Sequence, residues 1–130
     1  MKTAAAKPKH DKQRGQAQLL MTLFDHWSLG QMEIANLLGI STSSRDTLSK
    51  YRKGERGIST AQDSQQRAGY LLGIHKVLRL LYPRNKELLY GWVKKRNRYF
   101  DNLTPLEIMT EEGLIGIARV YQCVNFMRGH

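Results

Sequence analysis

The chain has 130 residues, enough for one compact domain or for two small helical subdomains that share a core, but too few for a typical enzyme with a deep cleft. Hydrophobic residues make up 41% and charged residues 25%, a balance that excludes an intrinsically disordered chain. The net charge of +10 favours a phosphate-rich or acidic partner, nucleic acid first, although a basic protein without such a partner would have the same composition.

The cysteine content and the apolar stretches indicate the compartment. Cys123 is the single cysteine, so an intrachain disulfide and a secreted scaffold that depends on one are excluded. The longest apolar stretch, residues 114–118, is far shorter than a membrane-spanning helix, and residues 4–6 are too few for the core of a signal peptide. We therefore expect a protein of a reducing cytoplasm that does not enter a membrane.

The N-terminal part predicts a basic arm followed by two helices. Residues 1–15 carry five lysines and arginines and few large apolar residues, which is typical of a flexible arm that either lies along phosphates or simply frays. From Gln16 to Trp27, apolar residues recur at three- and four-residue spacing, so a first core helix is expected. Ser28 is the candidate N-cap of a second helix, and Gly39 is suited to end it in the left-handed conformation.

Two further helices follow in the sequence. The run of hydroxyl residues at 41–44 offers N-caps for a third helix, which Gly54 ends. Ser59 or Thr60 caps a long fourth helix, and Pro83 stops it. This helix bears an apolar stripe that suits either a dimer surface or the core of the chain itself: Tyr70, Ile74, Val77, Leu78 and Leu81.

The remaining pattern is also helical. Residues 85–95 predict one helix. Thr104 as N-cap, Pro105 at the first helical position and Glu107 as partner in a capping box begin a short helix, and a last helix runs over residues 112–127. Because strand-like alternation persists nowhere, we predict an all-α fold.

The second and third helices have the features of a helix-turn-helix motif. Such a motif needs a small residue where the helices cross, a turn that tolerates positive φ and apolar residues that hold the second helix against the first. Ala35, Gly39, Ile40 and Leu48 supply these features in order. The spacing is about three residues longer than in the simplest motifs, so the recognition helix is expected to start near Ser44.

The exposed side of that recognition helix carries the candidate DNA-binding residues. Arginine and lysine suit guanine edges and phosphates, and hydroxyl groups at a helix N-terminus suit phosphates. The alternative is an inert helical hairpin, because two amphipathic helices around a glycine also occur in bundles that never contact DNA. The candidates are Ser43, Ser44, Arg45, Thr47, Lys50, Arg52, Lys53 and Arg56.

The C-terminal half, residues 83–129, has a more specific pattern. It resembles the toxin-binding domain of the Xre/MbcA/ParS-type antitoxins: a helix bearing tryptophan, a link containing asparagine, a Pro-Leu-Glu helix start, a glycine and a final amphipathic helix. Arg96 stands where this family often has proline, and Asn102 where it often has glycine. The residues that carry the resemblance are Trp92, Asn97, Phe100, the NLTPLEIM segment at 102–109, Gly113 and Gly129.

The resemblance implies an antitoxin with an Xre-like helix-turn-helix and a partner toxin of the RES type, which in this family consumes NAD. The antitoxin would shield the active-site cleft of the toxin with its last helix and tail. Apolar side chains there would anchor in a pocket while polar ones bond around it, unless the apolar members pack in the core of this chain, as we favour for Tyr121. The expected toxin-binding residues are Arg119, Asn125, Phe126, Met127, Arg128, Gly129 and His130.

No catalytic set emerges from the sequence. The histidines lack metal-site spacing and Cys123 lies among apolar residues of a predicted helix, so we expect no enzyme activity, no metal and no cofactor. Two alternatives to the antitoxin remain. One is a free-standing helix-turn-helix transcriptional regulator without a toxin, and the other is an interaction module whose helix-turn-helix is vestigial.

The predicted organisation has four parts. One helix-turn-helix buries little surface on DNA, and two-fold proteins read inverted half-sites, so a homodimer that binds double-stranded operator DNA and represses its own operon is expected. The parts are a flexible basic arm at 1–15, the helix-turn-helix region at 16–58, a connecting helix at 59–82 and the toxin-binding region at 83–130.

Overall fold

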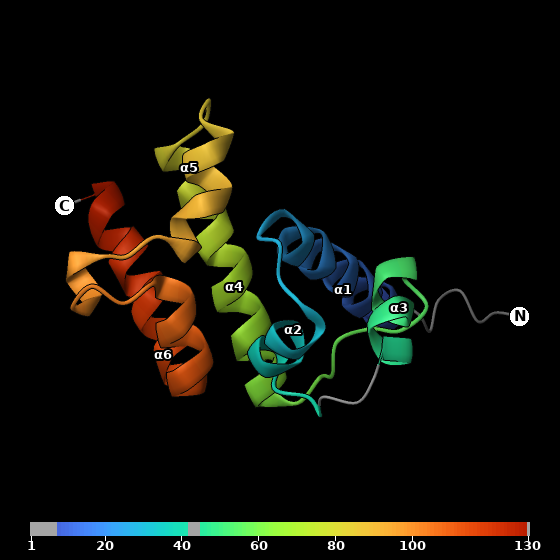
Figure 1. Cartoon of the computed structure of the whole chain (residues 1–130). Helices are drawn as coiled ribbons and strands as arrows, with labels where there is room; N and C mark the ends of the chain where they lie inside the picture. The colour runs from blue at the N-terminus through green and yellow to red at the C-terminus, as the bar shows by residue number, and fades with distance from the viewer. Residues whose placement is uncertain (1–7, 42–44, 130) are drawn as a thin grey trace, which may run out of the picture.

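The computed structural model describes residues 8–41 and 45–129, and the regular elements of this part of the chain are helices joined by turns and loops, without a β-strand (Figure 1). The all-α prediction is therefore confirmed. The elements are α1 (Pro8–His26), α2 (Gln31–Leu38), α3 (Arg45–Lys53), α4 (Gln62–Leu81), α5 (Lys86–Gly91), the 3₁₀ turns η2 (Trp92–Lys94) and η3 (Arg98–Phe100), and α6 (Pro105–Gly129). None of these helices is long and apolar enough to cross a membrane.

Helix α1 begins earlier than predicted. It starts at Pro8, a residue that is favoured in a first helical turn, and Asp11 complements the helix dipole there. The predicted flexible arm is therefore wrong for residues 8–15, and residues 1–7 lie outside the described part. Tertiary contact supports the extra turns, because the Ile58 N–H donates to the Gln13 carbonyl at 3.3 Å. A distant loop thus covers a segment whose own composition is polar.

The starts of two helices differ from the predicted caps. Ser28 has φ of 57° and is not the N-cap of α2; that position is Gly30, whose N–H donates to Glu33 Oε1 at 2.9 Å. Neither Ser59 nor Thr60 caps α4, which begins one residue after Ala61 without a side-chain cap. The Ser59 hydroxyl accepts from the Ala61 N–H at 3.1 Å, so it closes a local turn before the helix.

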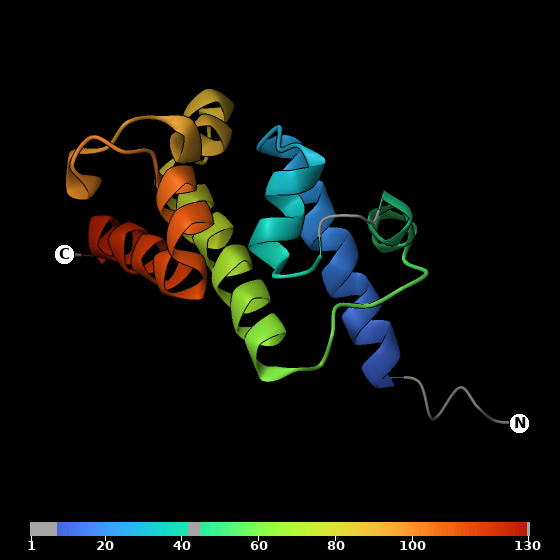
Figure 2. The same cartoon turned by 60° about the horizontal axis from the view of Figure 1, so that its bottom comes forward.

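Helix α4 lies at the centre of the fold, between α1 and α2 on one side and α6 on the other (Figure 2). Ala68, Leu71, Ile74 and Leu78 are fully buried in this position. The apolar stripe of α4 is therefore part of the chain's own core, and the alternative use of it as a dimer surface is wrong. Burial of each of the three larger side chains, Leu71, Ile74 and Leu78, contributes about 1.5–3 kcal/mol to folding.

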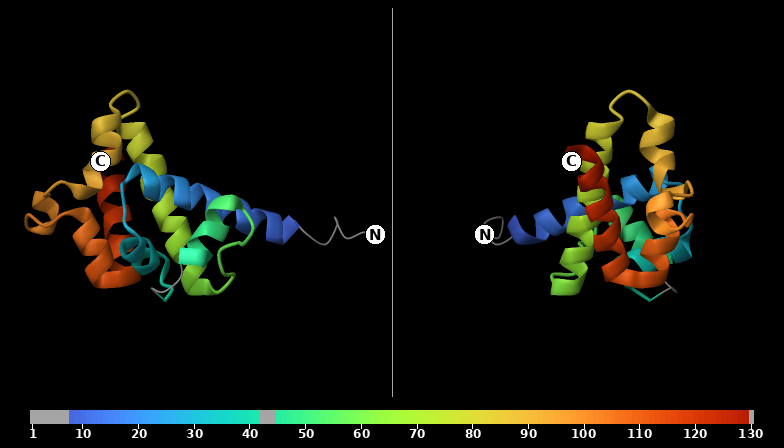
Figure 3. Two further views of the ribbon diagram at one scale, coloured as in Figure 1. Left: turned by 45° about the vertical axis from the view of Figure 1, so that its right-hand side comes forward. Right: turned by 90° about the vertical axis from the view of Figure 1, so that its left-hand side faces the viewer.

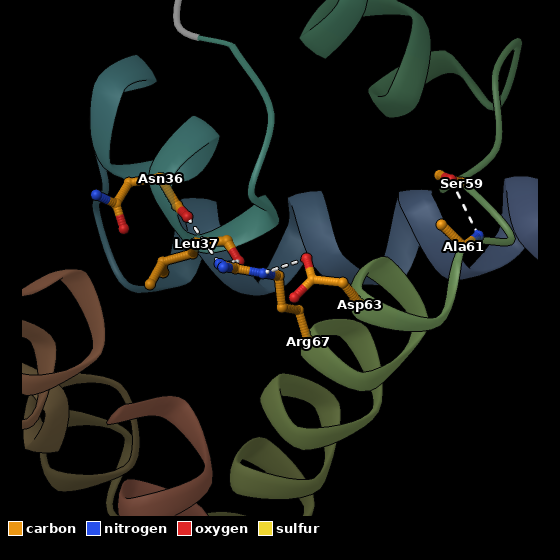
Figure 4. A network of polar contacts seen from close by, with 6 residues as sticks. All are labelled: Asn36, Leu37, Ser59, Ala61, Asp63 and Arg67. Atoms are coloured by element: carbon orange, nitrogen blue, oxygen red, sulfur yellow. Dashed lines mark hydrogen bonds and ion pairs between the residues drawn. The ribbon is translucent and has the colours of Figure 1, made fainter. Parts of the chain in front are cut away.

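Arg67 of α4 fastens α2 to this central helix (Figure 4). Its Nη1 donates to the carbonyls of Asn36 and Leu37 at 3.1 and 3.2 Å, and its Nε donates to Asp63 Oδ2 at 2.8 Å. The last carbonyls of a helix have no partner within the helix, so this guanidinium caps the C-terminus of α2. Gly39 follows with φ of 73°, the left-handed conformation predicted for it.

The C-terminal helices pack on the side of α4 away from the α1 N-terminus (Figure 3). Helix α4 ends at Leu81, two residues before Pro83, as predicted. The capping box is confirmed: the Thr104 N–H donates to Glu107 Oε1 at 2.8 Å, and the Glu107 N–H donates to Thr104 Oγ1 at 3.0 Å. Gly113, with φ of 65° and ψ of −141°, interrupts α6, so the helix comprises the two segments that the sequence predicts.

Candidate functional site

The candidate DNA-binding residues lie on and around α3, at the end of the molecule opposite to α5 and α6 (Figures 1 and 2). Leu48 and Tyr51 are buried and attach α3 to α1. The prediction that α3 is held against α2 is wrong, because α3 packs chiefly on α1 and α2 packs on α4 and α6. Six residues separate α2 from α3, and this longer connection allows α3 to reach α1.

The side chains of α3 divide into exposed cations and cations that bond within the protein. Arg45 and Lys53 are exposed. Lys50 Nζ lies 3.3 Å from Asp46 Oδ2, and Arg52 Nη2 lies 2.8 Å from Asp25 Oδ1 on α1. Arg52 therefore joins α3 to α1 as well as adding positive charge. Because exposed ion pairs contribute about 0–1 kcal/mol, a phosphate can replace either carboxylate at little cost.

Two further candidates bond to each other, and two cannot be placed. Arg56, in the loop after α3, donates through Nη1 to the Thr47 hydroxyl at 3.1 Å. This contact directs the Arg56 guanidinium back toward α3, so the loop and the helix share one polar surface. Ser43 and Ser44 lie outside the described residues, and their roles stay predictions.

The candidate toxin-binding residues lie along the second segment of α6. Phe126 is 58% exposed and Met127 is 38% exposed, whereas Asn125 is half-buried. The helix continues through Gly129, so Arg128 and Gly129 are in its last turn and not beyond its end as predicted. His130 lies outside the described residues. The apolar members Phe126 and Met127 are thus not core residues of this chain.

Arg119 has an internal role that the sequence does not indicate. Its Nη1 lies 2.6 Å from both carboxylate oxygens of Glu112, and its guanidinium lies 5.6 Å from the ring centroid of Phe100. The hydrogen bond to Glu112 raises the pKa of Arg119. Arg119 therefore joins the two segments of α6 across Gly113 and lies over Phe100 of η3, while 41% of its side chain remains exposed.

The sequence reading missed one exposed apolar residue on the same helix. Ile115 is 72% exposed, and it lies on the same face as Arg119, Gln122 and Phe126 because these positions are spaced by four, three and four residues. We call these four residues the α6 stripe. Helical spacing could have found it, but the same spacing predicts a buried face, and only the packing of α6 decides which face is covered.

No protein-family model matches the chain. It is 30% identical over 124 residues to the uncharacterized protein y4oB of Sinorhizobium fredii (strain NBRC 101917 / NGR234), and the match covers 94% of this chain and 92% of that protein. The chain belongs to the y4oB family. Since the match spans nearly the full length, the α3 end and the α6 end of the molecule both fall within the family's shared architecture.

Two titratable side chains of this y4oB-family chain, Cys123 and His75, are wholly or partly removed from solvent. Cys123 is 1% exposed, and burial raises the pKa of its thiol to about 11. His75 lies beside Tyr90 with 5.9 Å between ring centroids, and burial, followed by the charges of Arg79 and His26, lowers the pKa of His75. No cluster of three or more metal-ligating residues occurs in the described ranges. The exposed surfaces of α3 and α6 are therefore the candidate sites.

Proposed function

We propose that this chain is the antitoxin of a type II toxin–antitoxin pair. It binds and neutralises a toxin of the RES type that consumes NAD, and as a homodimer it represses its own operon by binding double-stranded operator DNA. The two activities use opposite ends of the molecule, the α6 stripe with Met127 for the toxin and the surface around α3 for DNA.

The exposed apolar residues of α6 carry this proposal. Ile115 and Phe126 lie on the same face, about 16 Å apart along the helix at 1.5 Å per residue, and both are exposed, at 72% and 58%. Aromatic anchors near polar and cationic neighbours are typical of residues that dominate the affinity of protein interfaces. Together with the resemblance of residues 83–129 to antitoxins, this face is suited to a protein partner.

The cationic surface around α3 supports the DNA-binding activity. Arg45, Lys53 and Arg56 are exposed on one end of a protein with net charge +10. Each phosphate contact that replaces a counterion makes affinity depend on salt with a slope of about 0.9 per contact. The proposed repressor therefore binds its operator more weakly as salt rises.

Co-expression with the protein encoded by the neighbouring gene tests the toxin activity. We expect the neighbour to deplete NAD and stop growth when alone, and to be captured and silenced by this chain. Phe126→Ala should weaken the complex about thirtyfold, the effect of a residue that contributes about 2 kcal/mol. Leu80→Ala, at a residue that is 57% exposed on α4, is the matched control and should leave the complex intact.

The assignment of DNA binding to α3 and of toxin binding to the C-terminal end has its own test. Arg45→Ala or Lys50→Ala should weaken operator binding and leave toxin neutralisation unchanged, and removal of residues 128–130 should do the reverse. Folded variants that each lose both activities would refute the assignment of the two activities to separate ends of the molecule. If the neighbouring protein is neither toxic nor bound, the antitoxin proposal fails, and salt-dependent binding to the upstream DNA would then support a free-standing transcriptional regulator.

A further inference from the structure

A polar hollow of about 450 Å³ lies between the first turns of α1 and the loop that joins α3 to α4. It combines segments that are far apart in the sequence, and it opens at the same end of the molecule as α3. We call it the loop hollow. Its lining residues are Gln13, Arg14, Glu55, Arg56, Gly57, Ile58, Ser59 and Thr60.

The loop is pinned to α1 by close backbone packing. Ile58 is 5% exposed, and its N–H donates to the Gln13 carbonyl at 3.3 Å. A Cβ atom on Gly57 would lie 2.5 Å from Gln13 Cβ and 2.9 Å from the Gln13 carbonyl carbon, so only glycine permits this approach. The hollow is thus held in shape by the fold before any ligand arrives, which lowers the entropic cost of binding.

The lining offers several donors to an anion. Arg14 and Arg56 supply guanidinium groups, which match the geometry of phosphate oxygens, and Thr60 supplies an exposed hydroxyl. The Gln13 side chain also lines the hollow, and its Oε1 atom is buried without a hydrogen-bond partner. Only one carboxylate, that of Glu55, lines the hollow.

The internal partners of the two arginines do not prevent this use. Arg14 Nη1 lies 3.6 Å from Asp11 Oδ1, in an exposed pair of the kind that contributes about 0–1 kcal/mol. The Arg56 bond to Thr47 uses a neutral acceptor. Lys12 and Lys53 are exposed on the two elements that border the hollow. The anionic oxygens of a phosphodiester, which accept from two guanidinium groups at once, therefore gain more from these groups than their present partners supply.

We propose that the loop hollow is a seat for a backbone phosphate of duplex DNA, with Arg14 and Arg56 as its two cationic contacts. This inference rests on the DNA-binding half of the proposed function and extends the contact surface from α3 onto the first turns of α1. The seat positions the duplex and carries no sequence preference, since phosphates are common to all sequences.

The test measures binding of the full-length protein to a labelled duplex of about 30 base pairs from the DNA upstream of its gene, across a range of salt concentrations. Arg14→Gln and Arg56→Gln should each reduce the salt slope by about 0.9, which corresponds to about fivefold weaker binding at about 0.15 M salt. Arg84→Gln is the matched control. Arg84 is exposed just beyond the end of α4, whose 20 residues span about 30 Å away from the loop hollow.

A variant with the opposite sign separates this effect from misfolding. Glu55→Gln removes the carboxylate from the lining and should tighten DNA binding, which partial unfolding cannot do. Melting curves of all variants should match the wild type.

Each outcome decides a different statement. If the wild type binds DNA and Arg14→Gln behaves like Arg84→Gln, the phosphate seat is refuted while DNA binding stands. If the wild type binds no DNA, the DNA-binding half of the proposed function fails and the seat fails with it. If Arg14→Gln binds the duplex as the wild type does, while inorganic phosphate at about 5 mM and constant ionic strength raises the melting temperature of the wild type but not of Arg14→Gln, the hollow is a site for a free anion and the DNA seat is overturned.

Discussion

The substitution Gly116→Ala tests how the two segments of α6 are joined. Gly116 is buried, and the reversal at Gly113 places it against the backbone of the preceding segment. A Cβ atom at this position would collide with the carbonyl oxygen of Ile108, and it would lie 2.8 Å from Glu112 Cβ and 3.0 Å from the carbonyl carbon of Ile108. Backbone atoms cannot turn aside as a flexible side chain can, so the two segments must separate.

The expected magnitude is the difference between two opposing effects. Alanine in a helix interior is about 1 kcal/mol more favourable than glycine. Overpacking of a filled site costs about 1–3 kcal/mol, and contact with backbone belongs at or above the upper end of that range. We therefore expect Gly116→Ala to lower the free energy of unfolding by about 2 kcal/mol, which lowers the melting temperature by roughly 6 °C for a domain of this size.

The assay is thermal and urea unfolding followed by circular dichroism, with Gly69→Ala as the matched control. Gly69 is exposed within α4, and nothing lies within 4 Å of an added Cβ. Gly69→Ala should raise the free energy of unfolding by about 0.5–1 kcal/mol. A Gly116→Ala protein as stable as the wild type would show that the two segments of α6 are not in backbone contact.

Three further predictions follow from titratable and polar side chains. Hydrogen bonds with the backbone N–H of Thr104, and then with its hydroxyl, lower the pKa of Glu107. The capping box therefore contributes fully to the free energy of unfolding above the pKa of Glu107 in the unfolded chain, and this contribution is lost as the pH falls through its lower pKa in the folded protein. In urea unfolding measured as a function of pH, Glu107→Gln should lack this dependence. Burial raises the pKa of the Cys123 thiol from 9.0 to about 11, which lowers the fraction of reactive thiolate at about pH 8. Its reaction with a thiol reagent should therefore be at least a hundredfold slower in the folded than in the urea-unfolded chain. Equal rates would contradict the burial of Cys123. Arg67→Lys keeps the charge but loses the planar guanidinium, in which Nη1 reaches two carbonyls while Nε bonds to Asp63. It should lower the free energy of unfolding by about 1–2 kcal/mol and speed amide exchange in α2, whereas the exposed Arg79→Lys should change neither.

The local signals in the sequence predicted where several helices begin and end. Pro83 stops α4 after Leu81, and Gly39 adopts the left-handed conformation after α2. Thr104 and Glu107 form the capping box that begins α6. Each of these features depends on backbone groups within about four residues, so the residue types are sufficient to predict them.

The candidate surfaces were predictable in position but not in the state of their side chains. The basic residues after Ser44 and the apolar residues near the C-terminus do lie exposed at two ends of the fold. Their ion pairs could not be foreseen, because Arg52 pairs with Asp25 of α1 and Arg119 with Glu112 across the break in α6. The exposure of Ile115 was missed because only the packing of α6 decides which of its faces is covered.

The sequence by itself therefore determined the all-α class, the breaks at proline and glycine and the burial of Cys123, since propensity, capping and apolar periodicity act over one or two helical turns. Only the tertiary structure decided that α3 packs on α1, that the stripe of α4 belongs to the core and that a loop meets α1 around Gly57. These features depend on which apolar faces pack together between helices that are far apart in the chain. Apolar periodicity predicts which face of a helix is buried, but it does not predict which other helix packs on that face.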